Sequence, residues 1–319
     1  MAAHFLLSSA ARTLSVASVA RMSDEEAHAK FTEIRWADNG GEPYCPKCGS
    51  VALYTYKTRK LWKCKGCNKQ FSVTSGTIFA SRKLAVRDYL LAIAIFVNGA
   101  KGISALQIGR DLDVQYRTAF VLCHKLREAM GSEMAGTTLS GTVEVDGAYV
   151  GGHIRPANLK KDRVDRRLAE NQTGKRRVVI VARERKGRTL TTVTRQEADG
   201  VDFVAKVVRP GSTLHADEAS HWDALHAKFE AYRINHQIGY SIDGACTNQA
   251  ESFLARIRRM IDGQHHRVSP QYLYQYANHA AWLEDHRRES NGALAWRALG
   301  LALKHPVSRQ WKGYWQRGA

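Results

Sequence analysis

The stretch Thr142-Val-Glu-Val-Asp-Gly-Ala-Tyr-Val-Gly-Gly152 decides the fold class of this chain. Apolar Val143 and Val145 alternate with acidic Glu144 and Asp146, and this period of two is typical of a strand with one face on a core. The glycines that follow Asp146 allow another part of the backbone to come close. The stretch therefore predicts a strand that carries acidic side chains beside closely packed backbone.

The segments after this strand alternate between strand and helix patterns. Runs of β-branched residues indicate strands, and apolar residues three or four positions apart indicate helices. In chain order they predict a basic loop (153–177), a strand hairpin (178–182 and 189–194), a helix (201–208), a strand (213–216) followed by Asp217, a helix (221–229) and mostly helix from Asn248 onward. This order predicts an α/β domain with a mixed sheet.

Two Cys-x-x-Cys pairs, Cys45/Cys48 and Cys64/Cys67, lie near the start of the chain. Each pair brings two thiolates to one turn, and two such turns joined by a short hairpin make a closed, tetrahedral zinc site. Disulfides or four buried thiols are the alternative, which the cytosolic character of a basic chain disfavours. Residues 44–80 are therefore predicted to form a zinc ribbon whose Zn²⁺ is bound by all four cysteines.

The hairpin between the cysteine pairs is basic and aromatic. Its turn carries Lys57, Arg59 and Lys60, and Tyr54 and Tyr56 precede it. Cations hold phosphates and aromatic rings stack on bases, so this combination favours contact with DNA. Docking on another protein is the alternative function of such a ribbon.

Residues 84–130 have the period of helices. An apolar helix at 86–97, a second helix capped by Ser104 and a longer third one predict a helix-turn-helix, whose last helix lies in the major groove of DNA. A small helical bundle without a DNA role fits the same pattern. The outward side chains expected to contact DNA are Gln115, Arg117, Thr118 and Lys125.

Composition agrees with nucleic acid as a partner. The chain has 319 residues, of which 44% are hydrophobic, and a formal net charge of +18 from 48 basic and 30 acidic side chains. Its pI of about 9.8 is typical of nucleic-acid-binding domains. No apolar run reaches the ~18 residues of a membrane span. We therefore expect a cytoplasmic, nucleoid-associated protein without a membrane partner.

The N-terminal stretch resembles a targeting segment. Met1–Arg21 has no acidic side chain, carries Arg12 and Arg21, and is rich in Ser and Ala, as transit peptides are. The preferred interpretation is an over-long start before Met22, because Ser23–Glu26 is typical of a helix start. Organellar import is the lesser alternative. In either case the stretch is expected to stay outside the fold.

Three carboxylates stand where predicted elements begin or end, namely Asp146, Asp217 and Glu251. Phosphoryl transfer with two Mg²⁺ ions needs carboxylates from separate elements to meet around ions about 3.5–4 Å apart. Oxygen ligands suit Mg²⁺ or Mn²⁺. Ordinary surface or capping carboxylates are the alternative, and the residue pattern alone favours it because the chain has 30 acidic residues.

The motifs in their order resemble those of bacterial insertion-sequence transposases of the DDE superfamily, in the group with an N-terminal zinc ribbon. After the predicted ribbon and helix-turn-helix come Glu144–Gly152, His215–Glu218 and Thr247–Phe253. The segments 75–79 and 101–104 also resemble that group, and the likeness covers most of the chain. The resemblance implies a ribonuclease-H-like catalytic domain that cuts the ends of an element and joins the freed 3′-hydroxyl to target DNA.

The resemblance also implies roles for individual residues. Asp146 and Asp217 match the first and second catalytic carboxylates, which would bind Mg²⁺ (or Mn²⁺). The third position is open between Glu251 and Asn248, and Glu251 is preferred because a carboxylate binds Mg²⁺ more strongly than an amide.

DNA contact is expected beyond these carboxylates. Arg258 matches a basic residue that holds DNA on the same helix as Glu251, and Arg259 is the reserve candidate. The stretches 153–188 and 253–319 are rich in Lys and Arg and would neutralise many phosphates. The expected partners are double-stranded DNA, as terminal inverted repeats and as target, and a second copy of the chain, because paired ends favour a dimer.

Two other functions fit the same residues. A DNA-binding regulator descended from such an enzyme would bind without cutting, and a nuclease of the same fold would cut without joining. The expected organisation is an N-terminal stretch (1–22), a region containing the ribbon (23–82), a helix-turn-helix (83–131), the catalytic domain (142–290) and a basic tail (291–319).

Overall fold

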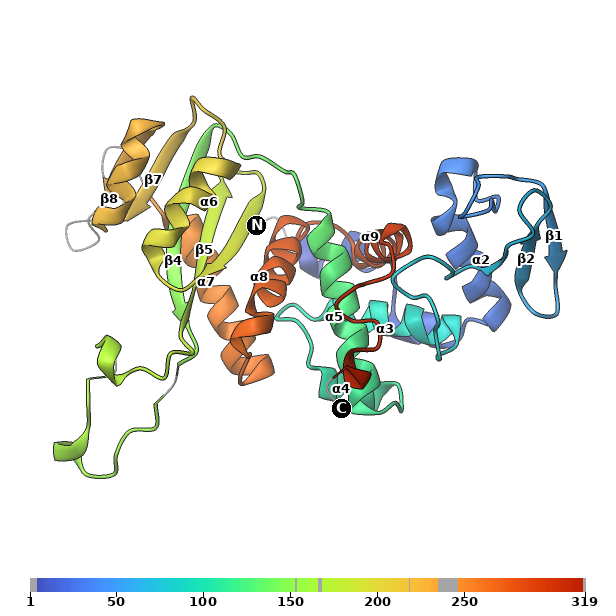
Figure 1. The fold of residues 1–319 in the computed structure, drawn as a ribbon, viewed down its shortest axis with the longest axis horizontal. Helices are drawn as coiled ribbons and strands as arrows, with labels where there is room; N and C mark the ends of the chain where they lie inside the picture. Colours follow the sequence, from blue (N-terminus) through green and yellow to red (C-terminus); the bar gives the residue numbers. More distant parts are fainter. Residues whose placement is uncertain (1–4, 153, 166–167, 218, 235–245, 318–319) are drawn as a thin grey trace. The chain divides into compact units, whose positions relative to one another are not determined.

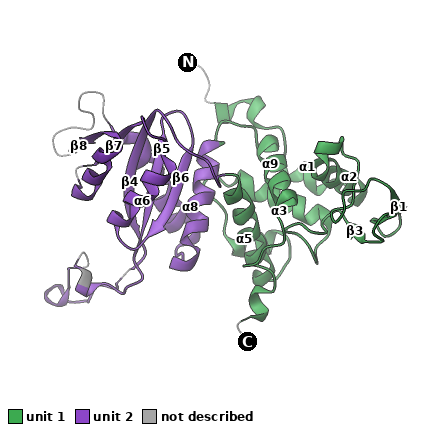
Figure 2. Ribbon diagram, turned by 45° about the horizontal axis from the view of Figure 1, so that its top comes forward, with its two compact units in different colours: residues 1–133, 286–319 green, residues 134–285 purple. Residues whose placement is uncertain are grey.

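The computed structural model describes residues 5–152, 154–165, 168–217, 219–234 and 246–317, whose course Figure 1 shows. The chain divides into unit 1, residues 1–133 and 286–319, and unit 2, residues 134–285 (Figure 2). His153 of the predicted basic loop and Glu218 of the His215–Glu218 segment lie outside the described residues. None of the helices within these ranges has the length and apolar character of a membrane span.

Unit 2 is built on a five-stranded sheet in the order β6-β5-β4-β7-β8. Its strands are β4 (Thr142–Val150), β5 (Arg177–Glu184), β6 (Thr189–Thr194), β7 (Thr213–Asp217) and β8 (Glu230–Ile234). The pairs β4–β5 and β5–β6 are antiparallel, whereas β4–β7 and β7–β8 are parallel. The predicted α/β fold class with a mixed, ribonuclease-H-like sheet is therefore confirmed.

Helices cover both faces of this sheet (Figure 1). On one face, Gly200 of α6 (Gly200–Val207) lies against Ile180 of β5. On the other face lie α7 (Asn248–Met260) and α8 (Pro270–Asp285), where Thr191 donates a buried hydrogen bond of 2.9 Å to Asn278. Thr191 is paired with Val181 of β5, so their side chains point to the same face of the sheet. Ile180 precedes Val181 on β5 and therefore points to the opposite face.

The segment between β7 and α7 differs from the prediction. Residues 220–227 form a 3₁₀ stretch where an α-helix was expected, and β8 follows it. β8 was not predicted because Glu230, Tyr232 and Arg233 are exposed and leave no apolar face to recognise.

Unit 1 contains the ribbon and the helices that lie outside unit 2. A three-stranded antiparallel sheet is formed by β1 (Leu53–Tyr56), β2 (Leu61–Cys64) and β3 (Gln70–Ser72). The helices are α1 (Val16–Ala20), α2 (Asp24–Arg35), α3 (Val86–Asn98), α4 (Ala105–Asp111), α5 (Tyr116–Ser132) and α9 (Asn291–Lys304). Trp36 packs edge-on against Trp62 and Phe71, with ring centroids 5.3 and 6.3 Å apart, and so forms an apolar core beside the ribbon.

Helices α3, α4 and α5 occur where the sequence predicted three helices. Ser104 caps α4 by accepting a 3.1 Å hydrogen bond from the Gln107 amide, and Asp113 in the turn before α5 has a φ of 51°, which Asp tolerates better than most residues. The predicted stripe of Ala119, Leu122, Cys123, Leu126 and Met130 is buried. That these three helices form a DNA-binding helix-turn-helix stays a prediction.

Both ends of the chain belong to unit 1, which differs from the expectation that residues 1–22 lie outside the fold and that 291–319 form a tail. Ala11 and Val19 are buried, and the amides of Thr13 and Leu14 donate to the Asn291 side chain at 2.9 and 3.0 Å. α9 buries one apolar face through residues such as Ala298 and Leu299. The charge composition of residues 1–22 and 291–319 led to the prediction that both lie outside the core. The spacing of apolar residues in these segments nevertheless gives each of them a face that can be buried.

We expect Val19→Asp to lower the free energy of unfolding of unit 1 by about 3 kcal/mol, because it buries an unpaired charge where Val19 is 0% exposed. The matched control is Ala17→Asp, which adds the same charge at an exposed position of the same helix. Thermal unfolding of the full chain measures both. Equal effects of the two variants would mean that this stretch does not contribute to the fold.

Candidate active site and metal centres

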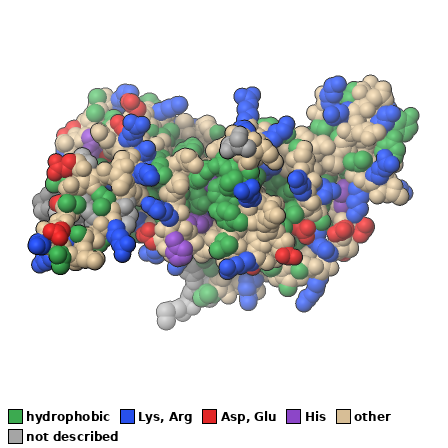
Figure 3. Space-filling model, turned by 60° about the horizontal axis from the view of Figure 1, so that its bottom comes forward, with side chains coloured by type: hydrophobic (Ala, Val, Ile, Leu, Met, Phe, Trp, Pro, Cys, Tyr) green, Lys and Arg blue, Asp and Glu red, His purple; other side chains and the backbone are tan. Residues whose placement is uncertain are grey.

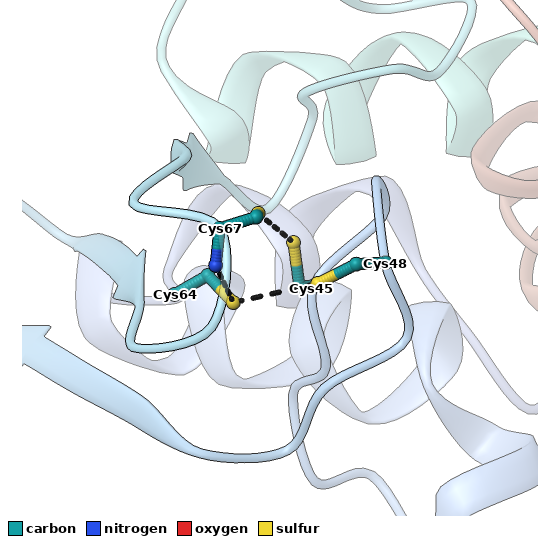
Figure 4. Close-up of side chains that lie close together, drawn as sticks. All are labelled: Cys45, Cys48, Cys64 and Cys67. Carbon is teal, nitrogen blue, oxygen red and sulfur yellow. Dashed lines mark hydrogen bonds between the residues drawn. The ribbon is translucent and has the colours of Figure 1, made fainter.

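Four cysteine sulfurs gather in the ribbon of unit 1. The Sγ atoms of Cys45, Cys48, Cys64 and Cys67 all lie within 4.8 Å of one another (Figure 4). The pairs Cys45–Cys67 and Cys48–Cys64 are 3.6 and 3.5 Å apart. Tetrahedral zinc with Zn–S bonds of about 2.3 Å holds its sulfurs about 3.8 Å apart, so the predicted zinc ligands have the spacing that Zn²⁺ requires.

The two cysteine turns have the same local structure. The Gly49 amide donates to the Cys45 carbonyl at 2.8 Å, and the Asn68 amide donates to the Cys64 carbonyl at 3.1 Å. Gly49 and Asn68 have positive φ angles of 74° and 59°, which glycine and asparagine accept most readily. The Cys67 amide donates to the Cys64 sulfur and lowers the pKa of that thiol to about 6. Cys64 is therefore ready to bind a metal as a thiolate.

Three carboxylates meet beside the neighbouring strands β4 and β7 of unit 2. Carboxylate oxygens of Asp146, Asp217 and Glu197 lie within 4.8 Å of one another. The parallel register pairs Glu144 of β4 with His215 of β7. Asp146 and Asp217 each follow two residues later, so they emerge side by side on the same face. The structure thus brings together the first two predicted catalytic carboxylates.

Glu197 is the member of this group that the sequence did not predict. It begins a short 3₁₀ turn (Glu197–Asp199) between β6 and α6. A Cβ atom added at Gly147 would overlap the Glu197 carboxylate, so the missing side chain at Gly147 is what lets Glu197 come up to Asp146. A glycine inside a strand often marks such a close approach, but it does not tell which residue approaches.

The electrostatics of the group favour a cation. Burial raises the pKa of Asp146 to about 7, with further contributions from Asp217, Glu197 and Glu251, although the Gly147 amide donates a 2.7 Å hydrogen bond that opposes the rise. Burial and Asp217 also raise the pKa of Glu197. Carboxylate oxygens held close in partly buried positions fit a hard divalent ion, which would remove their mutual repulsion.

Glu251 and Asn248, the alternatives for the third position, lie in the first turn of α7. Glu251 is close enough to raise the pKa of Asp146, and its carboxylate accepts a 3.0 Å hydrogen bond from the Thr247 hydroxyl. In the described part of the chain, however, the carboxylate that lies within 4.8 Å of both Asp146 and Asp217 is that of Glu197, and Glu251 is not in this group. The Asn248 side chain is exposed.

The basic residues predicted for DNA contact are mostly accessible. Arg258 and Arg259 are exposed on α7, and Lys57 and Arg59 are exposed at the ribbon tip. Lys60 instead forms an ion pair of 3.0 Å with Glu25. Lys and Arg side chains are spread over the face drawn in Figure 3.

The predicted DNA-contacting residues near α5 differ in accessibility. Gln115 and Arg117 are exposed, whereas Thr118 and Lys125 are half-buried, and burial lowers the pKa of Lys125. The Arg117 guanidinium lies 5.3 Å from the centre of the Trp315 ring, and Trp315 donates to the Arg117 carbonyl at 3.2 Å. The C-terminal segment therefore packs on the start of α5.

Comparison with known proteins agrees with these two metal centres. Residues 138–285 match the family described as ISXO2-like transposase domain, and residues 22–70 match the transposase zinc-ribbon domain. A protein of Halobacterium salinarum, described as an uncharacterized protein in transposable element ISH50, is 23% identical over 279 residues, which cover 80% of this chain and 88% of that protein. No solved structure matches the chain. The chain therefore combines an ISXO2-like transposase domain of the DDE superfamily with an N-terminal transposase zinc ribbon.

Proposed function

We propose that this transposase cleaves DNA at the ends of an insertion sequence and joins the freed 3′-hydroxyl to target DNA. The observation that carries the proposal is the meeting of Asp146, Asp217 and Glu197 from three separate elements within 4.8 Å. Two Mg²⁺ or Mn²⁺ ions, when bound there, supply activation of the attacking oxygen and stabilisation of the leaving oxygen.

The carboxylates divide the work of holding these ions. Asp217, Glu197 and Glu251 all lie close enough to Asp146 to add to the rise that burial causes in its pKa, so Asp146 would be the first residue to hold a metal ion there. Asp217 and Glu251 complete the proposed set, with Asn248 as the alternative to Glu251 and Glu197 as an additional ligand. Arg258 and Arg259, exposed on the helix that carries Glu251, would hold a DNA phosphate.

Unit 1 supplies the proposed contacts with the terminal repeats. At the ribbon tip, Lys57 and Arg59 are exposed, and the nearby Tyr54 and Tyr56 are 55% and 40% exposed, which suits phosphate binding and stacking. Lys60 is the weaker candidate because of its ion pair with Glu25. Near α5, the candidates are Gln115, Arg117, Thr118 and Lys125. We further propose that two copies act together, because an element has two ends to be cut.

Asp217→Asn is expected to lower DNA cleavage by about 10³-fold, because a proposed metal ligand is lost. DNA binding should persist or improve, because one negative charge beside the phosphates is removed. Duplexes carrying the sequences that bracket the gene, incubated with Mg²⁺ or Mn²⁺, allow cleavage and strand transfer to be measured on gels. The matched control is Asp202→Asn, which changes an exposed acid on α6 and should cleave as the wild type does.

The same assay separates the rival functions. A regulator binds these duplexes but cuts none of them, and its wild type and Asp146→Ala forms are indistinguishable. A nuclease without transposition releases cut ends and yields no strand-transfer product. Either result contradicts the proposal.

The carboxylate ligands can be ranked by three substitutions. We expect Glu251→Gln to lower single-turnover cleavage by about 10²-fold or more, and Glu197→Gln to weaken Mn²⁺ binding by about 10-fold. Asn248→Ala should have little effect. Cation-induced thermal shifts and cleavage rates measure these changes. Loss of cleavage in Asn248→Ala, with activity retained in Glu251→Gln, would assign the third position to the amide.

Removal of zinc should unfold the ribbon, because so small a sheet cannot fold on its own core. Cys64→Ser is expected to abolish bound zinc, to weaken the near-UV circular dichroism of the Trp36–Trp62 pair, and to reduce binding to the terminal sequences. Metal analysis and circular dichroism test this. Cys123→Ala serves as the control, since Cys123 is buried in α5 away from the four ligands. A ribbon that keeps its structure without metal would refute the zinc assignment.

A further inference from the structure

A layer of buried polar side chains lies next to the carboxylates of unit 2. Glu144 is 0% exposed and His215 is 5% exposed. They are register partners on the adjacent parallel strands β4 and β7. Each stands two residues before a candidate metal ligand, Asp146 or Asp217, on the same face of its strand. The proposed metal ligation gives neither of these buried groups a role.

The Glu144 carboxylate holds the start of α7. Its Oε2 atom accepts hydrogen bonds from the amides of Gln249 and Ala250, at 2.7 and 3.1 Å. First-turn amides have no partner inside their own helix, and the N-cap residue Thr247 makes no side-chain capping bond. A negative charge is favourable at this end of a helix. Glu144 thus caps α7 from a neighbouring strand.

The other oxygen of Glu144 ties the same helix start to two further strands. Its Oε1 atom accepts from Arg185 Nε at 2.9 Å. Arg185 Nη2 lies 2.9 Å from His215 Nδ1 and donates to the Cys246 carbonyl at 3.2 Å, and the Cys246 amide donates to His215 Nδ1 at 3.1 Å. The residues that lead into α7 are therefore attached to β7 and to the end of β5 as well as to β4.

We propose that Glu144 is a positioning residue that fixes the first turn of α7 and thereby holds Glu251 near Asp146. Glu251 directly follows Ala250, whose amide Glu144 binds, so a shift of this turn moves the Glu251 carboxylate with it. The inference rests on the proposed function, because it explains how the third carboxylate is held. It requires no contact between Glu144 and metal or DNA.

Hydrogen exchange of the wild-type protein tests the anchoring directly. Amides in the first turn of a helix ordinarily exchange fast, so slow exchange at Gln249 and Ala250 is the expected result. This measurement needs no variant and therefore decides the matter even where a substitution prevents folding. Fast exchange at both amides in the folded protein would overturn the proposal.

Two variants of Glu144 separate position from charge. Glu144→Gln keeps the length but turns an amide donor toward Arg185 or toward the α7 amides, whereas Glu144→Asp keeps the charge but is one methylene shorter. Both should speed exchange at Gln249 and Ala250 and lower cleavage by about 10-fold or more, the effect typical of groups that support metal ligands. Full activity of Glu144→Asp would show that only charge matters and would refute a positioning role.

A double substitution tests whether Glu144 acts through Glu251. If it does, Glu144→Gln combined with Glu251→Gln costs no more cleavage than Glu251→Gln alone. Fully additive losses would overturn the proposal. Glu251→Gln alone should leave exchange at Gln249 and Ala250 unchanged, because the anchor remains.

Failure of the proposed function has a different signature. A wild-type protein that cleaves no duplex in Mg²⁺ or Mn²⁺ refutes the proposed chemistry and with it any positioning role in cleavage. Exchange in α7 still reports the anchor in that case. Active wild-type protein with unprotected α7 amides refutes only the role of Glu144.

Discussion

The parallel pairing of β4 with β7 is the constraint on which the candidate active site depends. It sets Glu144 opposite His215, and from that register Asp146 and Asp217 emerge as neighbours. Two unit charges about 4 Å apart repel by roughly 4 kcal/mol at an effective dielectric constant of about 20. The apolar residues of both strands, Val143 and Val145 of β4 and Leu214 and Ala216 of β7, are buried. The free energy of this burial keeps the two strands paired although the carboxylates repel each other.

The repulsion links metal binding to the stability of unit 2. Asp146 is partly protonated near neutral pH when its pKa is about 7, because burial and the neighbouring carboxylates disfavour its charge. A divalent cation turns the same arrangement into shared attraction, so its binding free energy adds to folding by mass action. The ribbon reaches a similar coupling by another route, since four soft sulfur ligands replace the core that it is too small to form.

Sequence patterns predicted the elements whose signal is local. Alternation predicted β4, the cysteine spacing predicted the ribbon, and β-branched runs predicted the β5–β6 hairpin. Glu197 was missed because a glycine at position 147 indicates that some residue comes close there, whereas the identity of that residue is decided only by the folded sheet. The contact of Thr13 and Leu14 with the start of α9 was missed for a similar reason, since these residues and Asn291 are brought together only by tertiary structure.

Residues of the single strand β4 contribute to the position of every acidic group in the site. Along β4, Glu144 caps α7 and so locates Glu251, Asp146 faces Asp217, and Gly147 leaves room for Glu197. Because successive residues point to opposite faces, β4 contacts the helix on one side and the turn before α6 on the other. A slip of one residue in its pairing would exchange these faces and separate the carboxylates. The register of β4, more than any one carboxylate, therefore determines whether a metal site can form.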